Sequence, residues 1–167
     1  MTGDDRSEAI RDWWARHIGN REAPASRALA ARLGRADRIG ALAEPAVQVL
    51  GRQLSLRDPV QLAALAQVLA GIRANTSRHL PQLLGAGEVP PLSTLRFQRL
   101  IRATDDELPQ ALRRALPMVE RTCNVGALGR DLLLWSHPEH GESVRARWCF
   151  HYFGAAAPAS LQPEAET

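Results

Sequence analysis

Apolar residues recur at helical spacing in one segment after another, and this pattern constrains the fold more than any other feature. Residues 60–73 show it best, with apolar side chains at Leu62, Leu65, Val68, Leu69 and Ile72. Spacings of three and four residues place such side chains on one face of an α-helix. The same pattern predicts helices over residues 6–18, 25–33, 44–54, 95–103, 104–121, 125–135 and 142–153. Because no segment alternates with a period of two, we predict an all-α helical bundle.

Proline and glycine indicate how the helices are connected. Asp58 followed by Pro59 is typical of a helix N-cap and first turn, and Pro117 should kink or shorten the helix in which it lies. Residues 75–92 hold five prolines and glycines, which predict a loop or hinge. We therefore expect an N-terminal helical half over 1–74, the hinge over 75–92, a C-terminal bundle over 93–153, and a tail over 154–167 whose composition predicts disorder.

The basic side chains other than histidine are all arginines, 21 in number, and the net charge is +3. Between residues 52 and 102, seven arginines stand against two acidic residues. Arginine offers a planar fork of donors that matches phosphate oxygens, and it keeps its charge. Biased codon usage also accounts for a preference for arginine over lysine, but the physical consequence is the same. The concentrated positive charge predicts a polyanionic partner.

Three of these arginines, Arg96, Arg99 and Arg102, occupy every third position of one short segment. Apolar residues lie between them, so a helix would carry the arginines on one face and the apolar residues on the other. Ser93 or Thr94 can cap the start of this helix. The segment therefore predicts a packed helix with a cationic stripe that faces outward.

Patterns typical of catalytic, cofactor or metal sites are missing from the chain. It has no phosphate-binding glycine motif, and its five histidines stand in no recognisable nucleophile setting. Four residues could supply zinc ligands, namely Cys123, His137, His140 and Cys149. They lack the closely spaced cysteine pair typical of zinc sites, so core thiols and surface histidines are favoured. We expect no enzyme activity, no cofactor and no metal.

The tryptophans, the apolar runs and the N-terminus indicate where the protein acts and what it contacts. Trp13, Trp14, Trp135 and Trp148 could stack on nucleobases, but their spacing favours positions in the core. The longest apolar run is far shorter than the roughly 20 residues of a membrane span. The polar, acidic N-terminus lacks the features of a secretory signal. We expect a cytoplasmic protein that has no membrane partner.

The second half of the chain carries an ordered series of motifs. They are Arg-Phe-x-x-Leu-Ile-Arg at 96–102, Leu-x-x-x-Leu-Arg-Arg at 108–114, Asn-Val at 124–125 leading to Asp-Leu-Leu-Leu-Trp at 131–135, and Arg-Ala-Arg-Trp at 145–148 with Tyr-Phe at 152–153. In this order they resemble the CasB family, the small subunit of the type I-E CRISPR surveillance complex called Cascade. The likeness covers residues 93–153 well and is weaker before them.

The resemblance implies an all-helical, non-catalytic subunit that acts in antiviral defence. Such subunits lie in Cascade as a head-to-tail pair, beside the backbone subunits that coat the guide RNA. The implied partners are guide RNA and target DNA, bound without sequence preference, the backbone and large subunits, and a second copy of the chain. Basic surface residues would hold the target strand, the displaced strand or both, and so stabilise the R-loop.

The resemblance also implies which residues contact nucleic acid. The residues that match the family's basic positions are, in a first group, Arg57, Arg96, Arg102 and Arg114 and, in a second group, Arg27, Arg99, Arg113, Arg145 and Arg147. Helical spacing turns Arg145 and Arg147 outward from the last predicted helix. These contacts should go to the sugar–phosphate backbone, which positions a strand but carries no sequence information.

Two other functions fit the composition. A stand-alone regulator of the helix-turn-helix type would read duplex DNA through the major groove. The acidic segment 104–107 argues against this, because it follows the arginine stripe directly and would repel phosphate. A helical protein–protein interaction module would use its arginines only for solubility, and charge reversal at Arg96 and Arg102 would then leave nucleic-acid affinity unchanged.

Overall fold

Helices make up most of the chain in the computed structural model, which describes residues 1–162, and the all-α prediction is confirmed. The helices are α1 Gly3–Trp14, α2 Pro24–Arg35, α3 Arg38–Leu42, α4 Pro45–Leu54, α5 Pro59–Ala70, α6 Leu80–Leu84, α7 Thr94–Ile101, α8 Leu108–Ala115, α9 Val125–Leu134 and α10 Gly141–Tyr152. Two strands of two residues each, β1 Ala74–Asn75 and β2 Thr122–Cys123, pair in parallel. This pairing is too short to leave an alternating pattern in the sequence.

Local sequence signals set the helix ends. The Asp58 carboxylate accepts hydrogen bonds from the backbone N–H groups of Val60 and Gln61 at 2.8 and 3.2 Å, so it caps α5 as predicted. Ser93 caps α7 in the same way through the N–H of Arg96. The predicted effect of Pro117 is also confirmed, because α8 ends at Ala115 and continues only as a 3₁₀ turn over Leu116–Val119.

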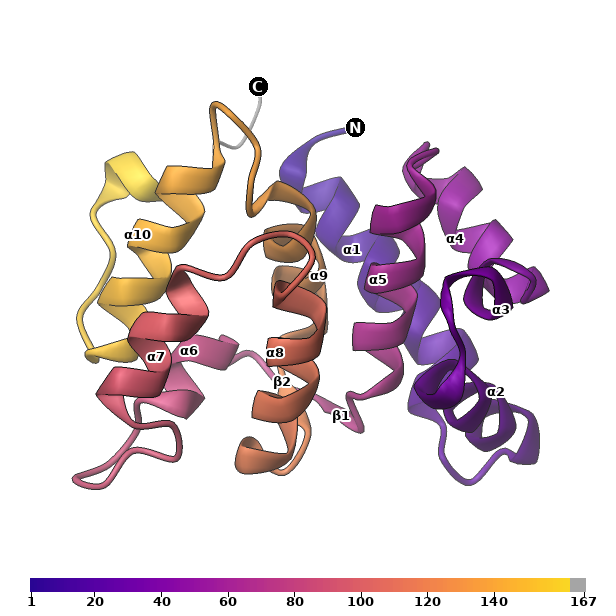
Figure 1. Cartoon of the computed structure of the whole chain (residues 1–167), viewed down its shortest axis with the longest axis horizontal. Coiled ribbons are helices and arrows are strands. Elements are labelled where there is room, and N and C mark those ends of the chain that lie inside the picture. The colour runs from indigo at the N-terminus through magenta and orange to yellow at the C-terminus, as the bar shows by residue number, and fades with distance from the viewer. Residues whose placement is uncertain (163–167) are drawn as a thin grey trace.

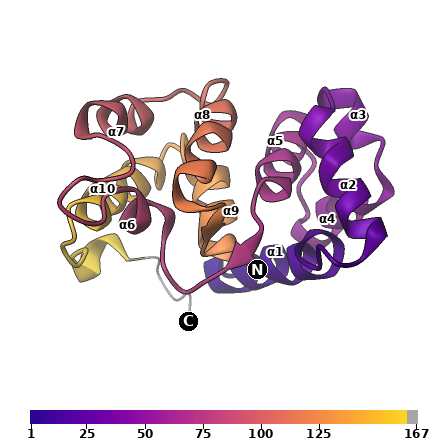
Figure 2. The same ribbon diagram turned by 90° about the horizontal axis from the view of Figure 1, so that it is seen from below.

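The helices form two groups that share one core (Figure 1). Helices α2, α3, α4 and α5 lie at one end of the molecule and α6, α7 and α10 at the other, with α8 and α9 between them. Helix α1 crosses the boundary, since it packs against both α4 and α9. Figure 2 shows α1 along one side of the molecule and α7 and α8 on the opposite side. The predicted halves 1–74 and 93–153 are thus joined through α1 in the folded chain.

Two glycines of α9 allow α1 to approach closely. A Cβ atom at Gly126 would lie 2.5 Å from the backbone oxygen of Ser7, and one at Gly129 would lie 2.7 Å from Ile10 Cγ2. Both distances are shorter than any real carbon contact, so larger residues would force the helices apart. The absence of side chains at these positions explains how the N-terminal helix enters the core of the C-terminal bundle.

The segment 75–92, for which a loop or hinge is predicted, contains α6 and is tied to its surroundings. Leu80 and Leu84 are buried, and α6 packs against α10. The Tyr152 hydroxyl donates a hydrogen bond of 2.6 Å to the backbone oxygen of Leu92. Helix α6 has only five residues, too few to show a helical period among the prolines and glycines around it.

The four tryptophans lie in the core, as their spacing predicted. Each indole N–H donates to an acceptor inside the protein: the backbone oxygens of Ala46, Ile72 and Ala103 for the first three, and Asp131 for Trp148.

None of the helices within residues 1–162 has the length and apolar character needed to cross a membrane. Of the predicted tail, 154–162 includes a short 3₁₀ helix over Ala159–Leu161, and 163–167 lie outside the described residues.

Candidate nucleic-acid interface

A groove between α7 and α8 brings together arginines that are distant in the sequence. Helix α7 buries Phe97 and Leu100 and leaves Arg96 and Arg99 exposed, as the stripe predicted. Across the groove, α8 contributes Arg114, which is also exposed. The groove has a volume of about 710 Å³ and is lined by Leu92, Arg96, Arg99, Leu100, Ala103, Glu107, Gln110, Ala111, Arg114, Ala115 and Met118. It therefore combines a cationic rim with an aliphatic floor.

The guanidinium groups at this groove are not neutralised by any carboxylate within residues 1–162. Among residues 1–162, Arg96, Arg99 and Arg114 form no salt bridge with any carboxylate. The acid in the groove lining is Glu107, whose carboxylate accepts a hydrogen bond from the backbone N–H of Thr104 at 3.1 Å. Three cations facing one carboxylate leave a net positive site, and unpaired arginine forks are well suited to phosphate oxygens.

A second groove continues this surface on the other side of α8. It lies between α2, α5 and α8, has a volume of about 490 Å³, and shares Gln110 and Arg114 with the first groove. Arg35, Arg113 and Arg121 also line it, and its lining contains no acidic residue among those described. We call the two grooves together the α8 cationic surface, defined by Arg35, Arg96, Arg99, Arg113, Arg114 and Arg121.

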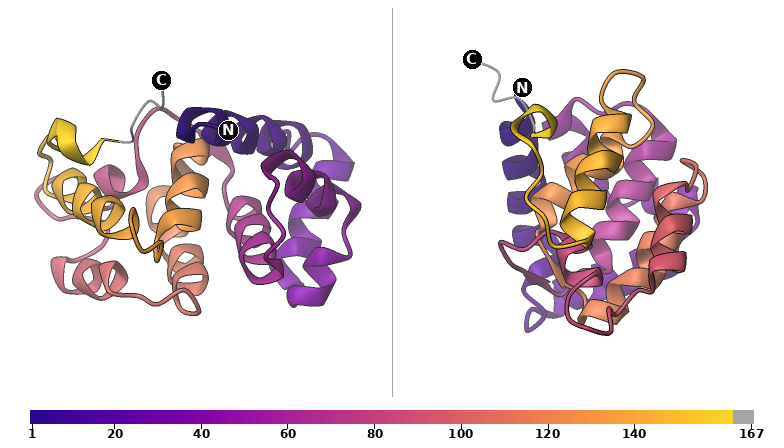
Figure 3. Two further views of the ribbon diagram at one scale, coloured as in Figure 1. Left: turned by 90° about the horizontal axis from the view of Figure 1, so that it is seen from above. Right: turned by 90° about the vertical axis from the view of Figure 1, so that its left-hand side faces the viewer.

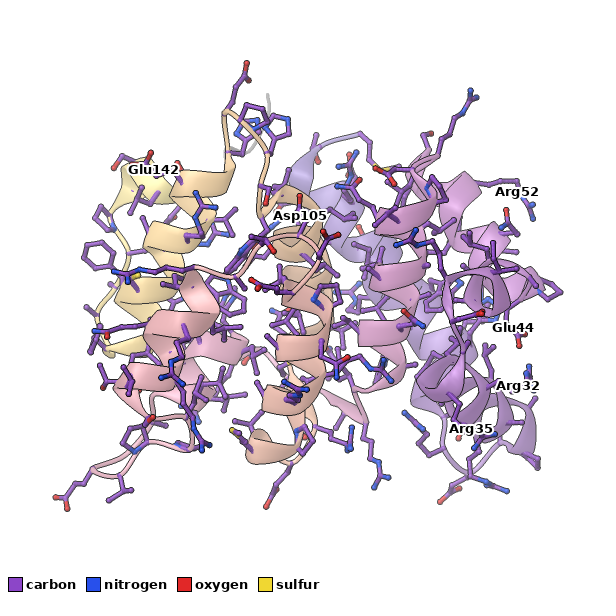
Figure 4. The ribbon with its side chains drawn as sticks, viewed as in Figure 1. Arg32, Arg35, Glu44, Arg52, Asp105 and Glu142 are labelled. Atoms are coloured by element: carbon purple, nitrogen blue, oxygen red, sulfur yellow. The ribbon has the colours of Figure 1, made fainter. Side chains whose placement is uncertain are left out.

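Two arginines of α2, both labelled in Figure 4, show why only some belong to this surface. Arg32 is held by Glu44, with its Nε 2.6 Å and its Nη2 3.1 Å from the two carboxylate oxygens. Arg35, one turn later, has no such partner within residues 1–162 and lines the second groove. The sequence did not single out Arg35 or Arg121, because only the fold brings them beside α8.

The half-buried residues of the surface are fixed by backbone contacts. Arg113 donates from Nη2 to the backbone oxygen of Gly34 at 2.6 Å, which ties α8 to the end of α2. Arg121 donates from Nη1 to the backbone oxygen of Gly71 at 3.3 Å. Because a carbonyl oxygen carries no net charge, both guanidinium groups keep their full positive charge at the groove.

Three exposed arginines among the predicted residues lie outside these grooves. Arg102 is exposed at the C-cap of α7 and lines neither groove. Arg27 is exposed and donates to the backbone oxygens of Arg21 and Glu22, both at 2.8 Å. Arg57 is exposed beside a separate hollow between α4 and α5 that Arg52 also lines. The structure thus brings Arg96, Arg99, Arg113 and Arg114 together and leaves these three apart.

The outward orientation predicted for the arginines of the last helix is wrong for Arg147. This residue is 5% exposed, and its Nη2 donates to Asp131 Oδ1 at 2.6 Å. Asp131 on α9 is itself 2% exposed, and a buried carboxylate needs a charged partner. Arg145 is half-buried and donates to the backbone oxygen of Trp135 at 3.0 Å. Neither residue has the exposure of the α7 arginines.

The residues considered for metal binding do not form a ligand set. Burial raises the pKa of the Cys123 thiol to about 12, so this group stays protonated at neutral pH. Burial also raises the pKa of Cys149, and the ring centroids of His137 and His140 lie 4.7 Å apart in an exposed turn. Within the described part of the chain, no three His, Cys, Asp or Glu side chains gather where they could share a metal ion.

Residues 13–153 match the family described as CRISPR-associated protein Cse2. The chain belongs to the Cse2 family. A Cse2 protein from Thermus thermophilus is 40% identical over 62 residues, which span 37% of this chain and 36% of that relative. The resemblance inferred from the second half of the sequence is therefore confirmed.

Solved structures extend the Cse2 likeness to almost the whole chain. The crystal structure of CasB from Thermus thermophilus superposes with a TM-score of 0.64 at 26% identity, covering 93% of this chain and 100% of CasB. A second crystal structure, of a Cse2-family protein from the same organism, gives a TM-score of 0.63, also at 26% identity, covering 90% of this chain and 99% of that protein. The Cse2 fold thus includes the helices that carry the α8 cationic surface.

Proposed function

We propose that this Cse2-family protein is a non-catalytic subunit of the Cascade complex that holds nucleic-acid backbone on its α8 cationic surface. In this role it stabilises the R-loop formed by guide RNA and target DNA. The observation that carries the proposal is the continuous pair of grooves lined by six arginines and one carboxylate. Arginine-rich grooves of this kind suit the polyanionic backbone of a nucleic-acid strand.

The chemistry of the grooves favours backbone contacts over base contacts. No aromatic side chain lines either groove among the described residues, so stacking on bases has no platform there. The guanidinium forks point to phosphate recognition, which is independent of base sequence. The aliphatic floor supplied by Leu100, Ala111 and Met118 can pack against sugars. Binding should therefore be insensitive to sequence and sensitive to salt.

Modest contacts are sufficient for this role. Forming an R-loop exchanges a DNA duplex for an RNA–DNA hybrid of nearly equal stability, so protein contacts to the backbone can shift the balance. Each phosphate neutralised on a single strand contributes about −0.7 to the slope of log affinity against log salt. The three exposed groove arginines on α7 and α8 would by that rule contribute about −2.

Fluorescence anisotropy of the full chain with labelled single strands and duplexes of unrelated sequence tests the proposal. The informative variant is Arg96→Gln/Arg114→Gln, which removes one cation from each wall of the first groove. The matched control is Arg11→Gln/Arg16→Gln, which removes two exposed cations from α1 and from the π-helical turn that follows it. Helix α1 lies on the side of the molecule opposite α7 and α8 (Figure 3). The groove variant should flatten the salt slope by about 1.4, and the control should leave it unchanged.

Each contrary result has a definite meaning. Selective binding of one duplex sequence would support the regulator instead. Equal affinities for wild type and the groove variant would show that the α8 cationic surface does not contact the strand. Binding by neither protein, in isolation or in an assembled complex, would leave the protein–protein interaction module as the better account.

A further inference from the structure

Two buried guanidinium groups share one carboxylate oxygen in the C-terminal half. Arg130 donates to Asp131 Oδ1 from Nε and Nη2, at 3.3 and 3.1 Å, and Arg147 donates to the same oxygen from Nη2 at 2.6 Å. The other oxygen, Oδ2, accepts from the indole N–H of Trp148 at 2.7 Å. The two arginines are 6% and 5% exposed. The Asp131 cluster, as we call these four residues, therefore carries one net positive charge away from bulk water.

A cavity of about 1000 Å³ adjoins this cluster. It lies between α6, α10 and residues 154–162, and its charged or titratable lining consists of Arg78, His79, Arg130, Arg147, His151 and the hydroxyl-bearing Tyr152. Asp131 is not part of the lining, and no other carboxylate among the described residues is. The rings of His79 and His151 lie side by side with their centroids 4.8 Å apart. Cationic groups thus converge on a space that contains no compensating charge from residues 1–162.

Hydrogen-bonding capacity is also left unused at this place. Arg147 Nε and His151 Nδ1 are buried and have no hydrogen-bond partner within residues 1–162. The arginine Nε–H is always a donor, and leaving a buried donor unpaired is costly. An excess buried charge and an unsatisfied donor beside one cavity are both relieved by the same kind of ligand, an anion with several acceptor oxygens.

We propose that this cavity binds a phosphate-bearing anion, either inorganic phosphate or the terminal phosphate monoester of a larger molecule. The exposed Arg78 and the two arginines of the Asp131 cluster supply the guanidinium donors. His79 and His151 add imidazole groups that can donate to phosphate oxygens. The site is separate from the α8 cationic surface, since the two share no lining residue among those the structure describes.

Burial, followed by the neighbouring basic groups, lowers the pKa of His79 and of His151, and the opposing effect of Asp131 is smaller. Both rings are therefore neutral at pH 7 in the absence of an anion, and each can donate through one nitrogen. A bound phosphate would change the electronic environment of both rings. Their NMR signals are accordingly a direct probe of the cavity that needs no mutation.

The test is a titration of the ¹⁵N-labelled full chain with inorganic phosphate at constant ionic strength, following the imidazole signals. We expect the signals of His79 and His151 to shift saturably, while His17, which lies after α1, stays still as an internal control. Arg78→Gln should weaken binding about tenfold, as expected for loss of one charge-assisted hydrogen bond. This residue is exposed, so its replacement should not disturb folding. The distant Arg11→Gln should bind as wild type does.

A second pair of ligands identifies the source of the phosphate. If a 5′-phosphorylated dinucleotide binds more tightly than inorganic phosphate, the site captures a strand end. If only inorganic phosphate binds, the site takes the free ion. The proposal is overturned if the His79 and His151 signals do not shift, if chloride shifts them equally, or if the unphosphorylated dinucleotide does so. It is also overturned if Arg78→Gln binds as tightly as wild type.

The same titration of Arg96→Gln/Arg114→Gln separates this site from the proposed function. That variant should show the wild-type shifts, because the substitutions lie outside the cavity. A phosphate response lost in this variant would assign the anion to the α8 cationic surface instead.

Discussion

The α8 cationic surface and the Asp131 cluster both contain arginines, but these arginines lie in opposite environments. At the surface, Arg96, Arg99 and Arg114 are exposed and have no carboxylate partner within residues 1–162. In the cluster, Arg130 and Arg147 are almost completely buried on one aspartate. The comparison teaches that the position of the nearest carboxylate, more than the sequence around an arginine, separates an exposed arginine free to contact a strand from a buried one that holds the fold together.

The largest expected effect comes from removing the carboxylate of the cluster. Asp131→Asn leaves two buried guanidinium groups without a counter-charge and should lower the free energy of unfolding by about 3–5 kcal/mol. Urea denaturation followed by tryptophan fluorescence measures this loss. The control is Asp105→Asn, an exposed acid labelled in Figure 4, which should change stability by less than about 0.5 kcal/mol. Equal effects at the two positions would remove the energetic basis of the comparison.

The next largest effect comes from replacing one arginine by methionine in each region. Arg147→Met removes charged hydrogen bonds to Asp131 and to the backbone oxygen of Leu161, and should cost about 2 kcal/mol of stability. Arg96→Met should change stability by less than about 0.5 kcal/mol while it weakens nucleic-acid binding. Denaturation and anisotropy give the stability and the nucleic-acid affinity of each variant. A loss of affinity for a strand without a terminal phosphate, in a fully folded Arg147→Met variant, would contradict the assignment of strand binding to the α8 cationic surface.

The smallest effect is a dependence of stability on pH. Burial lowers the pKa values of His79 and His151 below the ordinary value of 6.5, whereas the unfolded chain titrates near that value. A lowered pKa of a base means that stability is fully present above about pH 6.5 and declines as the pH falls from there through the folded-state pKa. The denaturation midpoint should therefore fall as the pH is lowered from about 7.5 to 5, and it should fall less steeply in His79→Gln than in the wild type.

Nucleic-acid binding should behave differently over the same pH range. Arginine does not titrate there, so the affinity of the folded chain for a single strand should stay constant. Anisotropy at two pH values within that range, in conditions where denaturation shows the chain to be folded, checks this point. An affinity that rises sharply on acidification would place histidines in the interface.

Local features of the sequence predicted much of the fold. Asp58 and Ser93 act on backbone groups two or three residues away, so their caps could be inferred from neighbours alone. Helices α1 and α5, with 12 residues each, are long enough for the helical spacing of their apolar residues to be visible in the sequence. Helix α3 and helix α6, with five residues each, were not predicted, because one turn and a half cannot display a period.

The candidate site could be predicted only where it lies within one helix. Arg96 and Arg99 share a helix face with a visible repeat, whereas Arg35 and Arg121 join them only through tertiary packing. The inward turn of Arg147 depends on Asp131, sixteen residues earlier, which the spacing of the last helix does not reveal. Likewise, the entry of α1 into the second half depends on Gly126 and Gly129, whose role becomes clear only when Ser7 and Ile10 are beside them.

The measurement that tests the central claim most directly is the dissociation rate of an R-loop from the assembled Cascade complex. The complex would contain wild-type chain, Arg96→Gln/Arg114→Gln or Arg11→Gln/Arg16→Gln, each confirmed to be incorporated. If the α8 cationic surface holds nucleic-acid backbone, the groove variant releases the R-loop faster and the difference narrows as salt increases, while the control matches wild type. Equal dissociation rates for all three complexes would contradict the account.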